Sequence, residues 1–102
     1  MDRYGLAMEF AEGLKQRFGD NIASVILFGS VAKGKETKES DLDILVVSKK
    51  RIFKDLKEPI GRILKQDVVP EVINLSVSEF DEMKHRDSPF YLTIEEEGVK
   101  IA

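Results

Sequence analysis

The sequence of 102 residues contains no cysteine, no tryptophan and only one histidine, His85. Without cysteine the chain can form no disulfide bond, thiolate zinc site or cysteine nucleophile, and a single histidine excludes any site that needs two from one chain. We interpret His85 as a surface residue, because no partner acid or nucleophile stands near it at a recognised spacing. Asparagine and glutamine number two each while 34% of the residues are charged, which is typical of proteins from thermophilic sources.

Long apolar runs are also missing. No run is long enough to cross a membrane and none resembles a signal peptide, so we expect a cytoplasmic protein without a membrane partner. The length suits a single domain, residues 1–102, and leaves no room for a separate substrate domain. The net charge of −3 does not indicate a general nucleic-acid binder, and we interpret the lysine-rich stretch 49–54 as solvated surface.

Apolar periodicity predicts helices and strands that follow one another along the chain. In the first half we expect a helix over residues 4–18, a strand over 22–28, a short helix capped by Ser30 and ending at 33, and a strand over 42–47. A helix over 52–65 that contains Pro59 and a strand over 68–75 follow. The rest of the chain should form a short helix capped by Ser76 or Ser78, a helix from Pro89 to Gly98, and a short strand over 99–101. Pro70 within the third strand indicates a sheet edge or a bulge. This order predicts an α/β (α+β) fold in which a small mixed β-sheet is covered by helices.

Two motifs stand at the ends of neighbouring predicted strands. The apolar run 25–28 ends in Gly29-Ser30, and Asp41 and Asp43 open the next run. Residues i and i+2 of a strand point to the same face, so Asp41 and Asp43 project side by side near the Gly-Ser turn. Two carboxylates so close repel each other unless a cation neutralises them. The constellation therefore indicates a metal-dependent nucleotide site.

The stretch from Gly29 to Lys35 also matches the G-x-x-x-x-G-K part of a Walker A phosphate loop. In that loop a serine or threonine follows the lysine and a long helix begins. Here Glu36 follows the lysine, and a polar loop leads into a strand. The structural context of a Walker loop is therefore absent, and we set this interpretation aside.

A strand that ends in Gly-Ser, a short helical turn and then Asp-x-Asp on the next strand resembles the nucleotidyltransferase signature of the DNA polymerase β superfamily. In this sequence the signature falls on Gly29-Ser30, Gly34, Asp41 and Asp43. The length and the long first helix are similar to the minimal nucleotidyltransferases (MNT) of prokaryotes. The resemblance covers essentially the whole chain. It implies a nucleotidyltransferase-like fold and an enzyme that uses Mg²⁺, with ATP or another NTP as substrate.

Each motif residue then has a physical role. Gly29 lets the backbone approach a phosphate, and Ser30 with the N–H groups after it offers hydrogen-bond donors. Asp41 and Asp43 would hold Mg²⁺, and two such ions would activate the attacking hydroxyl and stabilise the leaving pyrophosphate. Lys33 or Lys35 would neutralise charge on the triphosphate. The nucleotide-binding set implied by the resemblance is Gly29, Ser30, Lys33, Gly34 and Ser40.

The family site has a third acid on a neighbouring strand, for which Glu71 and Asp67 are the candidates. Glu71 lies inside an apolar strand, where a carboxylate is costly unless it is paired or binds a metal. Asp67 precedes that strand and suits a helix-to-strand turn. We predict that Glu71 joins Asp41 and Asp43 as a catalytic and metal-binding residue.

The sequence departs from the family pattern at two points. Glu71 stands where the family usually has aspartate, and Val31 and Lys33 stand where it often has arginines. A lysine keeps the positive charge but loses the bidentate recognition of phosphate that arginine provides.

The resemblance also implies a partner, because minimal nucleotidyltransferases are often paired with all-helical HEPN proteins in toxin–antitoxin systems. The implied reaction is AMP transfer to a tyrosine hydroxyl of the partner. A second hypothesis is a degraded site, in which the chain neutralises a partner or forms a homodimer by surface contact alone. A third, a nucleotidyltransferase for small molecules, would need additional walls around the acceptor that 102 residues supply only by oligomerisation.

Overall fold

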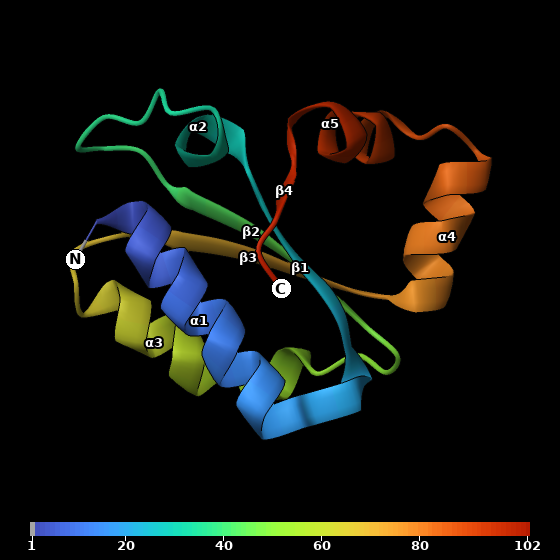
Figure 1. Ribbon diagram of the computed structural model, residues 1–102, viewed down its shortest axis with the longest axis horizontal. Coiled ribbons are helices and arrows are strands. Elements are labelled where there is room, and N and C mark those ends of the chain that lie inside the picture. Colours follow the sequence, from blue (N-terminus) through green and yellow to red (C-terminus); the bar gives the residue numbers. More distant parts are fainter. Residues whose placement is uncertain (1) are drawn as a thin grey trace.

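A four-stranded sheet with the strand order β3-β2-β1-β4 forms the middle layer of the protein (Figure 1). The computed structural model describes residues 2–102. The strands are β1 (Ile22–Phe28), β2 (Leu42–Ser48), β3 (Pro70–Ser76) and β4 (Val99–Lys100). β1 runs antiparallel to β2 and to β4, whereas β2 and β3 are parallel. The sheet is therefore mixed, and the predicted fold class is confirmed.

Helices cover both faces of this sheet (Figure 1). α1 (Arg3–Phe18) and α3 (Lys57–Leu64) lie on one face, and α4 (Val77–His85) and α5 (Pro89–Glu97) lie on the other. The one-turn helix α2 (Gly29–Ala32) follows β1 directly, and two 3-10 turns, η1 (Gly19–Asn21) and η2 (Phe53–Leu56), lead into β1 and α3. Within residues 2–102, no helix combines the length and the apolar character needed to span a bilayer.

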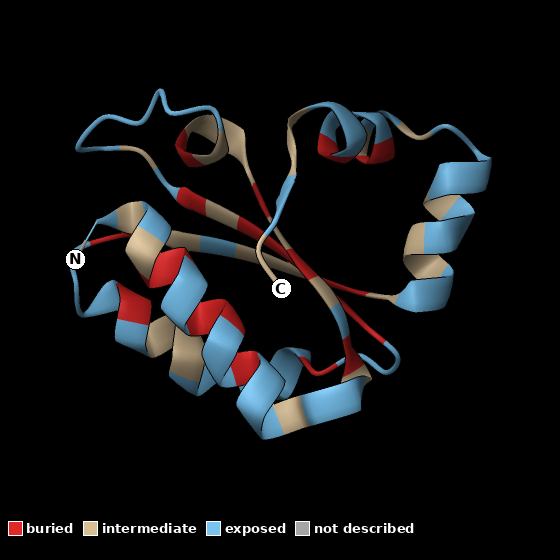
Figure 2. Cartoon of the chain, in the orientation of Figure 1, coloured by how far each residue is buried: buried red, intermediate tan, exposed pale blue. Residues whose placement is uncertain are grey.

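The larger core lies between the sheet and the α1–α3 layer. Leu6, Phe10 and Leu14 recur at helical spacing and are buried, so one side of α1 faces the sheet while the other remains exposed (Figure 2). The side chain of Asp2 caps the first turn of α1, and Gly19 ends the helix with a φ of +53°. From the strands this core receives mainly Val25, Leu27, Leu42, Ile44 and Val46.

The face under α4 and α5 has a smaller core, formed by Leu45, Val47, Leu75 and Ile94. Successive side chains of a strand point to opposite faces, so alternate residues of β2 enter the two cores. Asp43 stands two residues before Leu45 and therefore projects on the α4–α5 face. The alternation of side chains along β2 thus places Asp43 on the face that α4 and α5 cover.

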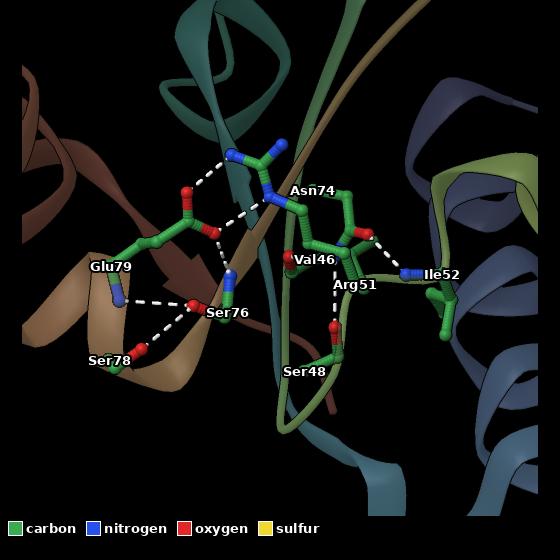
Figure 3. Close-up of polar contacts among 8 residues, drawn as sticks. All are labelled: Val46, Ser48, Arg51, Ile52, Asn74, Ser76, Ser78 and Glu79. Carbon is green, nitrogen blue, oxygen red and sulfur yellow. Dashed lines mark hydrogen bonds and ion pairs between the residues drawn. The ribbon is translucent and has the colours of Figure 1, made fainter.

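A buried polar network holds the turn that follows β2 (Figure 3). Asn74 on β3 accepts a hydrogen bond from the Ile52 backbone N–H at 2.7 Å. Its amide nitrogen donates to the Val46 carbonyl and to the Ser48 hydroxyl, each at 3.0 Å. Asn74 is only 6% exposed, and these three bonds satisfy its side chain. The network fixes where the chain leaves the sheet toward η2.

α4 begins with a capping box, in which Ser76 and Glu79 each bond the backbone N–H of the other. The Glu79 carboxylate also pairs with the guanidinium of Arg51 (Figure 3). The sequence offered Ser76 or Ser78 as the cap, and the structure selects Ser76. Because Ser76 is also the last residue of β3, α4 follows β3 without an intervening loop.

Three predicted elements differ from the structure. Ser30 is not a cap, because Gly29 already turns the chain with a φ of +74° and α2 begins there after the extended residue Phe28. The single helix predicted over 52–65 divides into η2 and α3, and Pro59 falls in the first turn of α3, where its missing N–H has no helical partner to lose. The third strand begins at Pro70 instead of 68, at the predicted edge of the sheet.

Candidate functional site

Gly29 brings the end of β1 into contact with the start of β2. Its φ of +74° lies in the left-handed region that glycine tolerates and other residues rarely adopt. A β-carbon at this position would overlap with Oδ2 of Asp43 and lie 3.0 Å from its Cγ. The glycine is therefore required both for the turn and for the close approach of the Asp43 carboxylate.

Asp43 lies on β2, which is flanked by β1 and β3. It is opposite Phe28 on β1 and opposite Glu71 on β3, near the end of the sheet at which β2 and β3 both begin. Asp41 lies just before β2, and its side chain is exposed. By strand alternation Asp43 and Glu71 share the α4–α5 face. Parallel pairing of β2 with β3 thus brings the predicted third acid, Glu71, beside the Asp-x-Asp motif.

The electrostatics of this carboxylate cluster, Asp41, Asp43 and Glu71, show that its members interact. Partial burial, the hydrogen bond and negative charge of Glu71, and the negative charge of Asp41 raise the pKa of Asp43 from 3.8 to about 6. Among residues 2–102, no lysine, arginine or histidine forms an ion pair with any of the three. The cluster is thus a concentration of negative charge that lacks a protein cation.

Asp67, the alternative third acid, occupies the turn before β3. Its φ is +58°, and its backbone N–H donates to the Leu64 carbonyl at 3.1 Å as α3 ends. It lines a polar hollow together with Arg3 and Lys38. Asp67 is not among the groups that raise the pKa of Asp43. The structure therefore places it at a helix-to-strand turn, and Glu71 next to the motif.

The loop between α2 and β2 contains the other predicted residues. Gly34 has a φ of +69°, and the Lys35 N–H donates to the Ser30 carbonyl at 2.9 Å, which closes the turn. The amino group of Lys33 pairs with the Glu97 carboxylate of α5 at 2.7 Å. Lys33 is thus bound to an acid outside the carboxylate cluster.

Ser40 organises the loop just before Asp41. Its hydroxyl accepts a hydrogen bond from the Thr37 N–H at 2.8 Å, and its carbonyl accepts one from Nε of Arg3 at 3.0 Å. Neither Arg3 nor Glu97 belongs to a motif recognised in the sequence. Both act on the loop from distant parts of the chain, and no local pattern marks such contacts.

A divalent cation fits the chemistry of the cluster, since Mg²⁺ prefers carboxylate oxygens. Nevertheless, among the residues that the structure describes, no three acidic, histidine or cysteine side chains are already arranged around a common metal position. Asp41 and Glu71 are exposed. The donor set therefore suits Mg²⁺, but the ligand geometry is not preformed.

Comparison with known sequences identifies the family of the chain. The nucleotidyltransferase domain family matches residues 7–101. A protein of Methanocaldococcus jannaschii named "Putative protein adenylyltransferase" is 51% identical over 41 residues, which are 40% of this chain and 28% of that protein. A second protein of that name from the same organism is 51% identical over 39 residues, which are 38% of this chain and 39% of its own length. The matched segments thus span under two fifths of each relative.

Solved structures share the fold. A crystal structure of a toxin-antitoxin with AMP-PNP aligns with a TM-score of 0.64 and 17% identity, over 93% of this chain and 72% of that one. A structure of the tri-AMPylated Shewanella oneidensis HEPN toxin in complex with an MNT antitoxin also aligns. The TM-score is 0.57 and the identity 16%, over 96% of this chain and 71% of the matched chain. At these identities the likeness establishes the fold, which is nucleotidyltransferase-like.

Proposed function

Because this chain belongs to the nucleotidyltransferase domain family, we propose that it transfers AMP from ATP and Mg²⁺ to a hydroxyl group of a partner protein. The observation that supports this proposal most directly is the carboxylate cluster beside Gly29. Asp43 on β2 and Glu71 on the parallel strand β3 lie beside Asp41, and among the residues described none of the three forms an ion pair with a protein cation. The glycine at the adjacent turn lets the backbone approach the Asp43 carboxylate closely. The protein adenylyltransferase relatives favour AMP as the transferred group.

In the proposed reaction the hydroxyl oxygen of the acceptor bonds to the α-phosphorus of ATP. The bond from that phosphorus to the oxygen bridging the α- and β-phosphates breaks, and pyrophosphate leaves with the electron pair. The proton of the hydroxyl passes to a carboxylate of the cluster. When bound to Asp41, Asp43 and Glu71, Mg²⁺ supplies the positive charge that the triphosphate and the acids require.

The chain's own residues position the nucleotide. The backbone N–H groups at Ser30 and Val31 begin a helix without a side-chain cap, so they suit a phosphate oxygen. Lys33 follows within one turn and offers a positive charge, while Gly34 and Ser40 shape the loop that leads to Asp41. These roles assign the nucleotide to the end of the sheet at which β2 and β3 begin.

We assign the acceptor to a HEPN-type helical protein, with this chain as the antitoxin of the pair. The S. oneidensis structure contains an AMPylated HEPN toxin together with an MNT antitoxin of this fold, which supports such a partner. The residues described form two helical layers around one sheet.

A second function is binding alone, by a degraded site. Two observations favour it: the three carboxylates are not arranged around a common position, and Lys33 is already paired with Glu97. In that case the chain would neutralise its partner, or pair with a second copy, without chemistry.

The two functions are separated by thermal-shift titration with ATP, MgCl2 and EDTA on the wild type and on the Asp41→Asn/Asp43→Asn variant. Ligand at about one hundred times its dissociation constant adds roughly 2.7 kcal/mol to stability. A shift that requires Mg²⁺ and is lost in the variant supports the enzyme, and transfer of radiolabel from α-³²P-ATP to purified HEPN proteins then tests the acceptor. No shift at millimolar ATP would leave only the binding function.

A further inference from the structure

An ion pair links the proposed phosphate-binding turn to the last helix. Nζ of Lys33 lies 2.7 Å from Oε1 of Glu97, and the two side chains are 42% and 28% exposed. Lys33 directly follows α2, while Glu97 is the last residue of α5. Two elements far apart in the sequence are thus joined where the nucleotide would bind.

The backbone of Lys33 is close to the carboxylate cluster. Its N–H donates to the Gly29 carbonyl at 3.2 Å, so it stands one helical turn from the residue that contacts Asp43. The cluster has no protein cation, yet the amino group of Lys33 binds Glu97 instead. An anion as large as a triphosphate at Gly29 would come within reach of the same amino group.

Glu97 is held in place by the packing of α5. Phe90 near the start of this helix contacts Phe28 edge-on, with ring centroids 5.8 Å apart, and Ile94 is buried. After Glu97 the chain passes so close to α5 that a β-carbon at Gly98 would lie 2.5 Å from the Ile94 carbonyl oxygen. The backbone of α5 that carries Glu97 is therefore held against the sheet.

We propose that Glu97 is an internal competitor of the nucleotide, which holds Lys33 in the free protein and yields it when a triphosphate binds. The proposal rests on the proposed nucleotide site and adds a residue that sets its affinity. Glu97 is then a positioning residue: it acts on the nucleotide through Lys33.

The direction of the effect follows from charge. Binding of ATP exchanges one anionic partner of Lys33 for another and leaves the Glu97 carboxylate near a highly negative ligand. Both effects oppose binding, and removal of the carboxylate charge removes both. A partly exposed ion pair contributes at most about 1 kcal/mol, so the exchange of partners by Lys33 costs little. Loss of the Lys33–Glu97 ion pair then alters the affinity for ATP about two- to fivefold. AMP lacks the β- and γ-phosphates and should depend less on Glu97.

The test compares the wild type with Glu97→Gln, Glu96→Gln and Lys33→Met by isothermal titration with ATP and with AMP in MgCl2. Glu96 is the exposed neighbour of Glu97 and controls for the loss of one negative charge. We expect Glu97→Gln to bind ATP about two- to fivefold more tightly than Glu96→Gln, with a smaller change for AMP. In a Lys33→Met background the gain should shrink to the part that comes from direct repulsion between Glu97 and the ligand, whereas a merely structural role of Glu97 would leave the gain unchanged.

Each outcome decides the matter. If the wild type binds ATP and Glu97→Gln binds no more tightly than Glu96→Gln, competition by Glu97 is wrong while the nucleotide site stands. If only Glu97→Gln binds ATP, the competition is supported in its strongest form. If no variant binds ATP, the proposed function and the role of Glu97 both fail.

Discussion

Gly29 and Asp43 meet at the end of β1 in a contact that allows no side chain on the glycine. The left-handed φ of Gly29 and the nearness of Oδ2 of Asp43 are two separate constraints on one residue. The turn that the nucleotide would use and the carboxylate that the metal would use are therefore parts of one structural unit.

Gly29→Ala should destabilise the protein by about 1–3 kcal/mol, because it adds left-handed strain and an overlap with Asp43. The matched control is Gly34→Ala, whose φ of +69° is similarly strained but whose β-carbon would have no atom within 4 Å. Urea denaturation of both variants separates the strain from the overlap. A smaller loss of stability at position 29 than at 34 would contradict the close contact.

Asp41→Asn/Asp43→Asn should abolish AMP transfer and leave the folded protein at least as stable as the wild type at pH 7. Burial and then the neighbouring acids Glu71 and Asp41 raise the pKa of Asp43, and a neutral amide at position 43 carries no buried charge for them to act on. Circular dichroism and urea denaturation report the fold, and a radiolabel assay reports transfer. A variant that still transfers AMP would show that chemistry occurs elsewhere.

Stability should depend on pH through Asp43. Its pKa is about 6 in the folded protein against an ordinary 3.8, so the folded state binds this proton more tightly than the unfolded chain. The resulting stabilisation is complete below pH 3.8 and is lost as the pH rises through 6. Asp43→Asn should therefore match the wild type near pH 4 and exceed it at pH 7 by on the order of 1 kcal/mol, allowing for solvent screening. Urea midpoints between pH 4 and 8 measure the difference, with Asp20→Asn as the control at the opposite end of β1.

Magnesium should stabilise the wild type and release protons. Binding to the cluster requires ionised carboxylates, and Asp43 is partly protonated near pH 6. Melting temperatures with MgCl2 and with NaCl at equal ionic strength measure the stabilisation, and titration at pH 6 in two buffers counts the protons. Equal shifts in the two salts, or in Glu71→Gln and the wild type, would contradict a metal site that includes Glu71.

Asn74→Ala should lower stability by about 1–3 kcal/mol, since the Ile52 N–H and the Val46 carbonyl would lose a buried partner. Asn74→Asp keeps the acceptor for Ile52 but sets a carboxylate oxygen against the Val46 carbonyl, so it should be at least as harmful. Binding of ATP by the folded fraction should not change, because the network lies at the ends of β2 and β3 opposite to the carboxylate cluster. Weaker binding in both variants would connect the two ends of the sheet.

Much of the fold and part of the candidate site follow from local pattern. The run from Ile22 to Phe28 is apolar except for Ser24, and its bounds as β1 are those predicted. Glu71 was predicted as the third acid because a carboxylate in an apolar strand is costly unless it is paired or binds a metal. The structure places Glu71 opposite Asp43. In both cases the deciding information lies within a few neighbouring residues.

Contacts between distant residues were not predictable in this way. The direction of β3 relative to β2, which brings Glu71 beside Asp43, depends on how η2 and α3 cross the sheet. The bond from Arg3 to the Ser40 carbonyl joins residues 37 positions apart, and no spacing rule marks it. Ser30 was misread for a local reason, since a glycine that adopts a positive φ begins the helix earlier than a serine cap would.

The strand order has one more consequence, for how this sheet meets other chains. An open edge offers unpaired N–H and C=O groups on which a foreign strand can assemble, the first step of aggregation. Here one edge is β4, only two residues long, and the other is β3, which begins with a proline that has no N–H to donate. Neither edge favours growth of the sheet, so recognition of a partner by strand addition is disfavoured and helices and loops are left as its contact surface.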